Sequence, residues 1–385
     1  MPQCDVLIVG GGPAGSTCAR ELVKAGADVV VVDRARFPRD KVCAGWITPA
    51  VVEALDLDLD DYGSERTLQP FSGFRTGTLE GDRRTTDFGR IVSYGIRRFE
   101  FDDYLLRRSG VRVMAGEPLR ALQRDGDGWL VNDTWHASMI VGAGGHFCPV
   151  ARHLNHTEYG TPHHEKVVVA QEIEFRMDDR MAATCRVQRE SPELFFWPDL
   201  HGYGWCVRKG DFLNVGVGRL SQENFPATVR EFAQLVERLD LVPGSVPSPW
   251  KGHAYLVNRT SRRRIVQDGV MLVGDAAGLA LAPSGEGILT AIESGLMAAA
   301  RIVAAGGCYA QDQLAPYDAW IDERVGPRGR AGAFGHVPRW FTRLVSRALF
   351  NSSWLTRRVL LEDGFLHVRR PPVDVEHPGT PHPVV

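Results

Sequence analysis

The sequence lacks features that define several classes of protein. No run of 18 apolar residues occurs among its 385 positions, so no helix is expected to span a membrane. Its seven cysteines are odd in number and scattered, with no C-x-x-C pair, which predicts reduced thiols rather than a disulfide framework or a zinc site. The formal charge of −2 gives no reason to expect a nucleic-acid partner.

Length and the position of the first motif add further bounds. A chain of 385 residues can hold one large domain or two closely joined domains, and 44% hydrophobic residues suit a globular core. The first recognisable motif, a strand followed by a glycine-rich turn, starts at residue 5, so we expect no signal or transit peptide before it. Together with reduced thiols, these features predict a cytoplasmic protein.

Residues 5–33 form the most informative stretch, DVLIVGGGPAGSTCARELVKAGADVVVVD. Its pattern predicts a strand, a glycine-rich turn, a helix and a second strand. Gly10, Gly12 and Gly15 stand in G-x-G-x-x-G spacing, which permits a tight turn, the approach of a pyrophosphate to the helix N-terminus, and close packing of the helix. Asp33 ends the second strand, where it can accept hydrogen bonds from an adenosine ribose. The stretch therefore predicts a dinucleotide-binding site.

A second motif follows an apolar strand expected at 270–273. Asp275 lies at the carboxyl end of that strand, where it can bond a polyol, and the segment PSGEGI follows. Gly285 and Gly287 stand at the start of a long Ala-rich helix expected from about 284 to 304, whose exposed N–H groups can face the N1/C2 edge of a flavin. An ordinary strand-to-helix turn with a glycine-rich cap is the open alternative.

The middle of the chain has a different pattern. Period-two alternation from Val169 and several further apolar segments predict an antiparallel sheet, with a hairpin turn at Lys209-Gly210-Asp211. We expect an α/β fold (α+β overall), in which a Rossmann-like nucleotide-binding domain carries an inserted antiparallel β-sheet domain for the substrate and a C-terminal helical segment. The expected boundaries are 1–65, 95–160 and 255–330 for the nucleotide-binding domain, 66–94 and 161–254 for the sheet domain, and 331–385 for the helical segment and tail.

Five segments carry a resemblance to a known family: VGGGPAGSTCA, DKVCAGWITP, RRFEFDDYL, VGAGGHFCPVAR and VGDAAGLALAPSGEGILTAIESG. They resemble motifs of the FAD-dependent oxidoreductases of the p-hydroxybenzoate-hydroxylase-like group, and within it the chain is most similar to the geranylgeranyl reductase family. This resemblance covers nearly all of the expected nucleotide-binding domain. It implies that FAD is bound by Gly10, Gly12, Pro13, Ala14, Gly15, Asp33, Arg34, Lys41, Val42, Cys43, Ala44, Gly45, Arg98, Gly144, Gly274, Asp275, Pro283, Gly285, Gly287 and Ile288.

Two departures from the family motifs matter. In the loop that resembles K-x-C-G-G, Ala44 takes the place of a glycine and Trp46 follows. Gly144 stands where the group usually has an Asp, which the resemblance links to contacts with FAD and NAD(P)H. No second G-x-G-x-x-G unit is present. Direct reduction by NAD(P)H is therefore an open question, and an external electron donor (a ferredoxin, a flavodoxin or a separate reductase) is the alternative.

Aromatic residues mark the expected substrate side. The segment LFFWPDL loosely resembles the Y-x-W-x-F-P motif of geranylgeranyl reductases. Packing in the core of the sheet is the open alternative for each aromatic residue. We expect a pocket for an apolar small molecule or lipid, lined by Trp46, Phe195, Phe196, Trp197 and Trp205.

Residues 336–350, HVPRWFTRLVSRALF, predict a basic amphipathic helix. Peripheral contact with an anionic membrane surface and a cover over the substrate cavity are both open roles for it. Its apolar face is expected to carry Trp340, Phe341, Leu344, Val345, Ala348 and Leu349, and its basic face Arg339, Arg343 and Arg347.

These features and the resemblance imply reduction of a C=C bond in an apolar or isoprenoid-type substrate, by hydride transfer from N5 of the reduced flavin. We expect Cys43 beside the reacting centre, as a proton donor or as a pocket wall. A flavin monooxygenase acting on an aromatic or apolar natural product is one alternative, and a non-catalytic prenyl- or lipid-binding protein on the same fold is another. We expect no metal site. The candidate ligands considered are His153, His156, His163 and His164, which fall in one loop.

Overall fold

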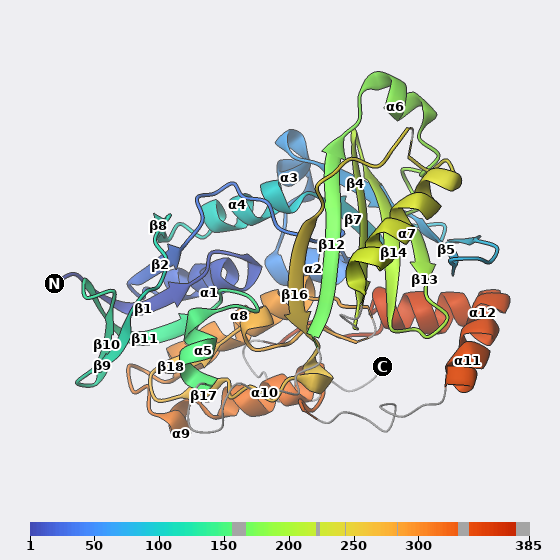
Figure 1. Ribbon diagram of the computed structural model, residues 1–385. Coiled ribbons are helices and arrows are strands. Elements are labelled where there is room, and N and C mark those ends of the chain that lie inside the picture. Colours follow the sequence, from blue (N-terminus) through green and yellow to red (C-terminus); the bar gives the residue numbers. More distant parts are fainter. Residues whose placement is uncertain (156–166, 221–223, 243, 283, 330–338, 375–385) are drawn as a thin grey trace.

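The computed structural model describes residues 1–155, 167–220, 224–242, 244–282, 284–329 and 339–374 (Figure 1). Within these ranges the strands form three sheets. The eight-stranded sheet has the order β17-β18-β11-β1-β2-β8, and β10 pairs with both β11 and β9. Its strands are β1 (Gln3–Val9), β2 (Val29–Asp33), β8 (Arg112–Ala115), β9 (Leu122–Asp125), β10 (Gly128–Val131), β11 (Trp135–Gly142), β17 (Val266–Gln267) and β18 (Val270–Leu272).

The centre of this sheet is parallel and buried. Strand β1 pairs in parallel with β2 and with β11, and β11 pairs in parallel with β18. A parallel strand covered on both faces needs a nearly continuous apolar sequence, which explains the runs at 6–9 and 29–32. Helix α1 (Pro13–Lys24) contacts β1, β2 and helix α8 (Ile288–Ala304). The predicted Rossmann-like part of the fold is confirmed.

The seven-stranded sheet has the order β16-β12-β15-β14-β13-β5-β6. Its strands β14 and β15 join at Lys209-Gly210-Asp211, as the hairpin signal predicted. The predicted antiparallel sheet is confirmed, and one pair within it, β13 and β5, runs parallel. A parallel pair needs a long connection, and residues 79–192 supply it. The strands are β5 (Gly73–Thr78), β6 (Arg84–Asp87), β12 (Val167–Arg176), β13 (Glu193–Phe196), β14 (Gly202–Lys209), β15 (Phe212–Arg219) and β16 (Lys251–Leu256).

The two faces of this sheet have different neighbours. Helix α7 (Phe225–Arg238) packs on one face, in front of β14 in Figure 1. Side chains of the opposite face reach the loop at 43–45, which belongs to the nucleotide-binding part. The sheet therefore stands on the nucleotide-binding part and forms one wall of the space between them.

A small third sheet has the order β3-β7-β4, formed by β3 (Trp46–Ile47), β7 (Ser93–Ile96) and β4 (Leu68–Phe71). Residues 66–94 thus contribute strands to two sheets, since β5 and β6 join the large one. The remaining helices up to residue 325 are α2 (Pro49–Leu55), α3 (Leu59–Glu65), α4 (Arg98–Arg108), α5 (Pro149–Asn155), α6 (Asp179–Thr184), η1 (Asn258–Thr260), η2 (Gly274–Ala276), α9 (Gln311–Leu314) and α10 (Pro316–Val325).

The C-terminal segment is helical, as expected. It consists of α11 (Arg339–Asn351), α12 (Ser353–Leu355) and the π-helical η4 (Thr356–Phe365). Positions 336–338 of the predicted amphipathic helix lie outside the described residues. In the part of the chain that the structure describes, none of the helices is long and apolar enough to cross a membrane.

Candidate active site

A cavity of about 800 Å³ lies where the nucleotide-binding part meets the seven-stranded sheet. The carboxyl ends of β1 and β2 and the start of α1 border one end of it, and the loop at 39–46 borders its middle. Strands β12, β14, β15 and β16 contribute the opposite wall. Ligands of open α/β folds bind at the carboxyl ends of the strands, so this cavity is the candidate active site.

The turn after β1 has the geometry of a pyrophosphate-binding loop. Gly10 has a φ of +115°, and a Cβ there would lie 2.4 Å from the carbonyl oxygen of Ala143. Gly12 precedes α1, and the nearest atom to a Cβ at that position is Nη2 of Arg39, at 3.4 Å. Gly15 lies outside the cavity lining and serves packing, because its Cβ would lie 1.9 Å from the carbonyl oxygen of Gly10.

Asp33 lines the same end of the cavity. Its Oδ2 accepts a hydrogen bond from the N–H of Gly11 and its Oδ1 accepts one from the N–H of Ala35, each at 2.8 Å. A carboxylate offers about four acceptor positions, so capacity remains for ribose hydroxyls. The placement suits the role expected from the sequence.

Two arginines share one buried carboxylate beside the start of α1. Nε and Nη2 of Arg98 donate to Asp102 at 2.6 and 2.8 Å, and Nη2 of Arg39 lies 3.1 Å from the same carboxylate. Nη1 of Arg39 is buried and has no hydrogen-bond partner in the structure. A buried guanidinium donor that faces a helix N-terminus suits a phosphate oxygen. Sequence reasoning missed Arg39, whose signal is its place just before the DKVCAG segment.

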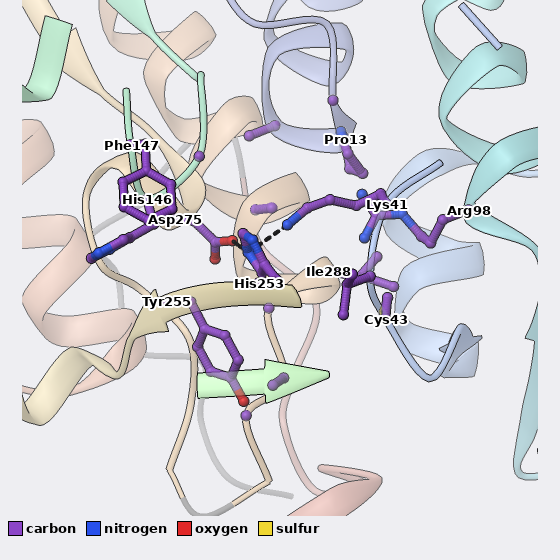
Figure 2. Close-up of a pocket in the computed structure, with 18 of the residues that line it drawn as sticks. Pro13, Lys41, Cys43, Arg98, His146, Phe147, His253, Tyr255, Asp275 and Ile288 are labelled. Atoms are coloured by element: carbon purple, nitrogen blue, oxygen red, sulfur yellow. Dashed lines mark hydrogen bonds and ion pairs between the residues drawn. The ribbon is translucent and has the colours of Figure 1, made fainter. Parts of the chain in front are cut away.

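A chain of three polar side chains crosses the cavity wall (Figure 2). Nζ of Lys41 lies 2.5 Å from Nε2 of His253, which lies 3.6 Å from Oδ2 of Asp275. Burial lowers the pKa of Lys41 to about 8, although the charge of Asp275 opposes this. Burial raises the pKa of Asp275, but the hydrogen bond with His253 and the charge of Lys41 outweigh it and hold that pKa at about 2. Asp275 is therefore a carboxylate at neutral pH.

The start of α8 differs from the sequence-based expectation. The N–H groups of Ile288 and Leu289 donate to Oε1 of Glu286, each at 2.9 Å. Two of the N–H donors expected to face a flavin are thus occupied by a carboxylate that lies two and three residues before them. Gly285 has a φ of +72°, and a Cβ there would lie 2.2 Å from the hydroxyl of Tyr255. Glycine is therefore required where this loop meets β16.

The loop at 42–45 lines the middle of the cavity, with Cys43 at its centre. Burial raises the pKa of the Cys43 thiol, and the charge of Arg98 opposes the rise. The thiol is accordingly neutral near pH 7. Trp46 and Trp205 also line the cavity, and their role in binding a substrate stays a prediction.

The wall contributed by the large sheet carries small side chains. Val168, Ala170 and Gly218 line the cavity, and a Cβ at Gly218 would meet no atom closer than 3.7 Å. Tyr203 and Tyr255 complete the aromatic part of this wall. The arrangement leaves an apolar space next to the cysteine loop, and period-two alternation places its lining residues on one face of the sheet.

Three of the expected substrate-pocket residues are corrected by the structure, because they are absent from the cavity lining. Phe195 and Trp197 project to the opposite face of the sheet, where both contact Phe232 of α7. Phe196 lies on the face of the sheet that borders the cavity, but its ring packs against the rings of Phe350 and Phe365. The alternative left open by the sequence, packing in the core, describes these three residues.

The other expected residues are placed as follows. Gly274 lies outside the lining and has a φ of +58°, and Pro283 lies outside the described residues. The lining also includes residues that sequence reasoning did not single out, above all Arg39, His146, Phe147, Tyr203, His253 and Tyr255. The expected residues that line the cavity are Gly10, Gly12, Pro13, Ala14, Asp33, Arg34, Lys41, Val42, Cys43, Ala44, Gly45, Trp46, Arg98, Gly144, Trp205, Asp275, Gly285, Gly287 and Ile288.

Of the four histidines considered as metal ligands, the structure describes one. His153 packs edge-on against Trp129, with ring centroids 5.7 Å apart. His156, His163 and His164 lie outside the described residues. Among the residues with described positions, no three His, Cys, Asp or Glu side chains are grouped so as to hold a metal ion.

The site combines a ribose acceptor, a glycine turn before a helix, a buried guanidinium and a carboxylate at the end of a second strand. These elements all line or border one cavity. The fold and the site therefore define a flavin-dependent oxidoreductase with a Rossmann-like FAD-binding domain.

Comparison with known proteins agrees. A family model described as "FAD binding domain" matches residues 3–315. Menaquinone reductase of Mycobacterium tuberculosis is 32% identical over 328 residues, which cover 77% of this chain and 76% of that protein. Digeranylgeranylglycerophospholipid reductase 3 of Methanosphaera stadtmanae is 30% identical and covers 85% of each chain. The chain belongs to this family of FAD-dependent oxidoreductases, which includes the geranylgeranyl reductases.

Solved structures show the same fold. A geranylgeranyl bacteriochlorophyll reductase-like protein of Thermoplasma acidophilum aligns with a TM-score of 0.71 at 22% identity, covering 94% of this chain and 91% of that one. PqsL of P. aeruginosa, in complex with 2-aminobenzoylacetate, aligns with a TM-score of 0.66 at 23% identity and covers 91% and 100%. The chain is thus an FAD-dependent oxidoreductase on a fold that reductases and other flavoenzymes share.

Proposed function

We propose that this protein is an FAD-dependent reductase that saturates a C=C bond of an apolar, isoprenoid-type substrate. The observation that carries the proposal is the apolar half of the cavity. It is walled by Trp46 and Trp205, has a floor of small residues, and opens directly beside the Cys43 loop. The curated relatives named as reductases support the proposal.

Specific residues are assigned to the cofactor in this proposal. Asp33 holds the adenosine ribose, the start of α1 and Arg39 hold the pyrophosphate, and Asp275 holds the ribityl chain. The flavin ring would then be held beside Cys43 and Ile288, both of which line the cavity. A substrate double bond would approach the ring from the apolar half of the cavity.

The reaction is a balanced two-electron reduction. When bound and reduced, FAD supplies a hydride from N5 to one carbon of the double bond. The other carbon receives a proton from the protein. Cys43 is one donor, since its raised pKa keeps the thiol protonated. The ammonium of Lys41, hydrogen-bonded to His253, is the other, since a pKa of about 8 stores a proton near neutrality.

The source of electrons is a further part of the proposal. Gly144 lines the cavity at the position where the family resemblance leads one to expect an Asp. Without that acid, we propose that an external donor such as a ferredoxin, a flavodoxin or a separate reductase delivers the electrons. This part of the proposal is independent of the substrate.

An anaerobic reduction assay tests the function. Purified protein with FAD is mixed with NADH, NADPH or reduced ferredoxin, and flavin absorbance is followed before and after addition of a polyprenyl substrate. Reoxidation of the flavin with stoichiometric loss of one C=C bond, without oxygen, supports a reductase. Turnover that requires oxygen and yields a hydroxylated product supports the monooxygenase instead. A protein that cannot be reconstituted with FAD contradicts both and supports lipid binding alone.

We further propose peripheral contact with an anionic membrane through α11 and α12. None of the described α11 residues lines the cavity, so the structure does not support the role of a cavity cover. Arg343 and Arg347 are exposed on the same helix, and α11 carries no acidic residue. Exposed apolar side chains next to arginines suit the boundary of an anionic bilayer. The exposed apolar residues are Phe341, Leu344, Val345 and Trp354.

A further inference from the structure

A buried polar cluster lies directly behind the Cys43 loop and takes no part in the cavity lining. Its members stand on three neighbouring strands of the large sheet: Glu172 and Glu174 on β12, Asn214 on β15 and Lys209 on β14. Lys209 is fully buried, and Glu172 and Asn214 are almost fully buried. The strand pairings set Glu174 opposite Asn214, and Asn214 opposite Val207, two residues before Lys209.

The cluster makes three contacts with the backbone of the loop. Nζ of Lys209 donates to the carbonyl oxygen of Ala44 at 3.1 Å. Nδ2 of Asn214 donates to the carbonyl oxygen of Cys43 at 3.3 Å. The backbone N–H of Cys43 lies near the carboxyl of Glu172 and lowers its pKa. Side chains of the large sheet thus bind successive peptide groups of the loop, at Cys43 and Ala44. Both residues line the cavity.

The remaining bonds of the cluster orient these three side chains. Nζ of Lys209 lies 2.6 Å from Oε2 of Glu174. The other carboxylate oxygen of Glu174 accepts a hydrogen bond from Nε of Arg97 at 2.9 Å. The amide oxygen of Asn214 accepts from the indole N–H of Trp205 at 2.7 Å. Trp205 lines the cavity, so the cluster touches both the cysteine loop and the aromatic wall. A side chain at Gly45 is excluded, because the residue has a φ of +70° and its Cβ would lie 2.4 Å from the carbonyl oxygen of Ile96, and Nζ of Lys209 is 2.5 Å from the same point.

Packing alone does not explain such a cluster. Buried charges lose several kcal/mol of hydration each, and an apolar cluster of the same volume would be at least as stable. Directed hydrogen bonds provide what apolar contacts lack, a fixed position for each peptide group they bind. The position fixed here is that of the loop segment 43–45.

We propose that Lys209, Asn214 and Glu172 are positioning residues that hold the Cys43–Gly45 loop at a set distance from the flavin ring. The proposal rests on the placement of the ring beside Cys43 given under the proposed function, and it does not depend on the substrate. The side chains act through the loop backbone, so their loss moves Cys43 without removing it.

The charge of Glu172 adds a pH dependence to this arrangement. Burial raises the pKa of Glu172 to about 7, the charge of Lys209 and the N–H of Cys43 oppose the rise, and Glu174 adds to it. Asn214 also faces the carboxyl and donates to its Oε2 at 3.3 Å. Loss of the proton from Glu172 therefore places a negative charge next to the backbone of Cys43 as the pH passes through neutrality.

Labelling of Cys43 in the FAD-free protein tests the proposal. Iodoacetamide is added, and modification of Cys43 is followed by peptide mass spectrometry in wild type, Lys209→Met and Asn214→Leu. Each variant removes one donor to the loop, so we expect Cys43 to be labelled about tenfold faster, which corresponds to the loss of one hydrogen bond. If Lys209→Met does not fold, Asn214→Leu decides, because it changes no charge.

The bound flavin gives the second readout. In wild type we expect the dependence of its reduction potential on pH to change slope near pH 7, and in Glu172→Gln we expect that change to vanish. Glu193→Gln is the matched control, because Glu193 is a buried carboxylate of the same sheet that pairs with Arg83 at 2.5 Å, away from the loop.

Either of two results overturns the proposal. One is wild-type labelling of Cys43 in both folded donor variants, and the other is an unchanged potential profile in Glu172→Gln. The labelling needs neither FAD nor substrate. A protein without C=C reductase activity that still shows faster labelling would therefore contradict the proposed function and leave the positioning role supported.

Discussion

The indole of Trp205 occupies the space where residue 216 would carry a side chain, since a Cβ at Gly216 would lie 2.2 Å from its Cζ2. The adjacent glycine of that face, Gly218, has no such neighbour. One glycine of β15 thus lets an aromatic wall lie close to the sheet, and the next leaves room. The lack of side chains at these two positions thus contributes to the apolar half of the cavity, which Gly218 lines.

Filling that room should affect the substrate and spare the cofactor. In Gly218→Leu we expect the KM for a long polyprenyl substrate to rise at least about tenfold, because the side chain occupies space that would otherwise take apolar atoms. FAD titration followed by flavin fluorescence should give an unchanged Kd. Gly252→Leu, on neighbouring β16 and outside the cavity lining, is the control. Wild-type KM in Gly218→Leu would show that the substrate lies elsewhere.

Arg39 should matter for the cofactor instead. Its unpaired buried Nη1 is expected to meet a phosphate, and a charge-assisted hydrogen bond contributes about 1.5 to 3 kcal/mol. We therefore expect Arg39→Met to weaken FAD binding about 10- to 100-fold in an equilibrium titration. Arg107→Met removes an exposed arginine of α4 and should leave the Kd unchanged. Equal affinities for Arg39→Met and wild type would place the pyrophosphate away from Arg39.

Cys43 is tested by comparing two small replacements. If the thiol delivers the proton, Cys43→Ala should lower kcat about 100-fold or more, a typical contribution of general acid catalysis, while Cys43→Ser should retain part of it. Anaerobic single-turnover measurements separate this step from cofactor binding. Normal turnover in Cys43→Ala would leave the Lys41–His253 pair as the proton source. In that case Lys41→Met should show the decrease in kcat.

The elements found from the sequence share one property: their signal is local. Gly10, Asp33 and Asp275 belong to strand–turn–helix units whose apolar runs and glycines stand within a few residues of them. Arg98 was found through a motif of the family. Residues of this kind are placed by the chain segment in which they occur, and the structure puts all four in one cavity.

The residues that were missed or misplaced depend on which face of the large sheet they occupy. His253 and Tyr255 reach the cavity because β16 pairs with β12 in a particular register, which the sequence of β16 does not reveal. Phe195 and Trp197 alternate with Phe196, and only the order of the strands decides which parity faces α7. Phe195 and Trp197 were therefore predicted correctly in residue type but on the wrong face of the sheet, whereas Trp46 and Trp205 do line the cavity.

Protein stability should depend on pH through Glu172. Its pKa is raised from 4.5 to about 7 by burial, so between these values the folded protein holds a proton that the unfolded chain has released. The contribution of this group to stability is thus lost as pH rises through that window, by up to about 1.4 kcal/mol per pH unit. Urea unfolding of Glu172→Gln should show the variant gaining stability relative to wild type from pH 5 to 7.

Above pH 7 the difference between Glu172→Gln and wild type should stay constant, since both states are then deprotonated. Glu231→Gln, an exposed position of α7, should show no such trend. A flat difference for Glu172→Gln across pH 5 to 7 would mean that the buried carboxyl is ionised throughout.

Membrane contact through α11 is tested by vesicle sedimentation. Leu344 is 57% exposed, and its transfer into a bilayer boundary is worth roughly 2 kcal/mol, so Leu344→Asp should weaken binding at least about tenfold. Arg343→Glu should weaken binding to vesicles that contain phosphatidylglycerol and have little effect with phosphatidylcholine alone. Val303→Asp alters a similarly exposed valine on α8 and should bind as wild type does. Equal loss in all three variants, or none in any, would assign the contact to another surface.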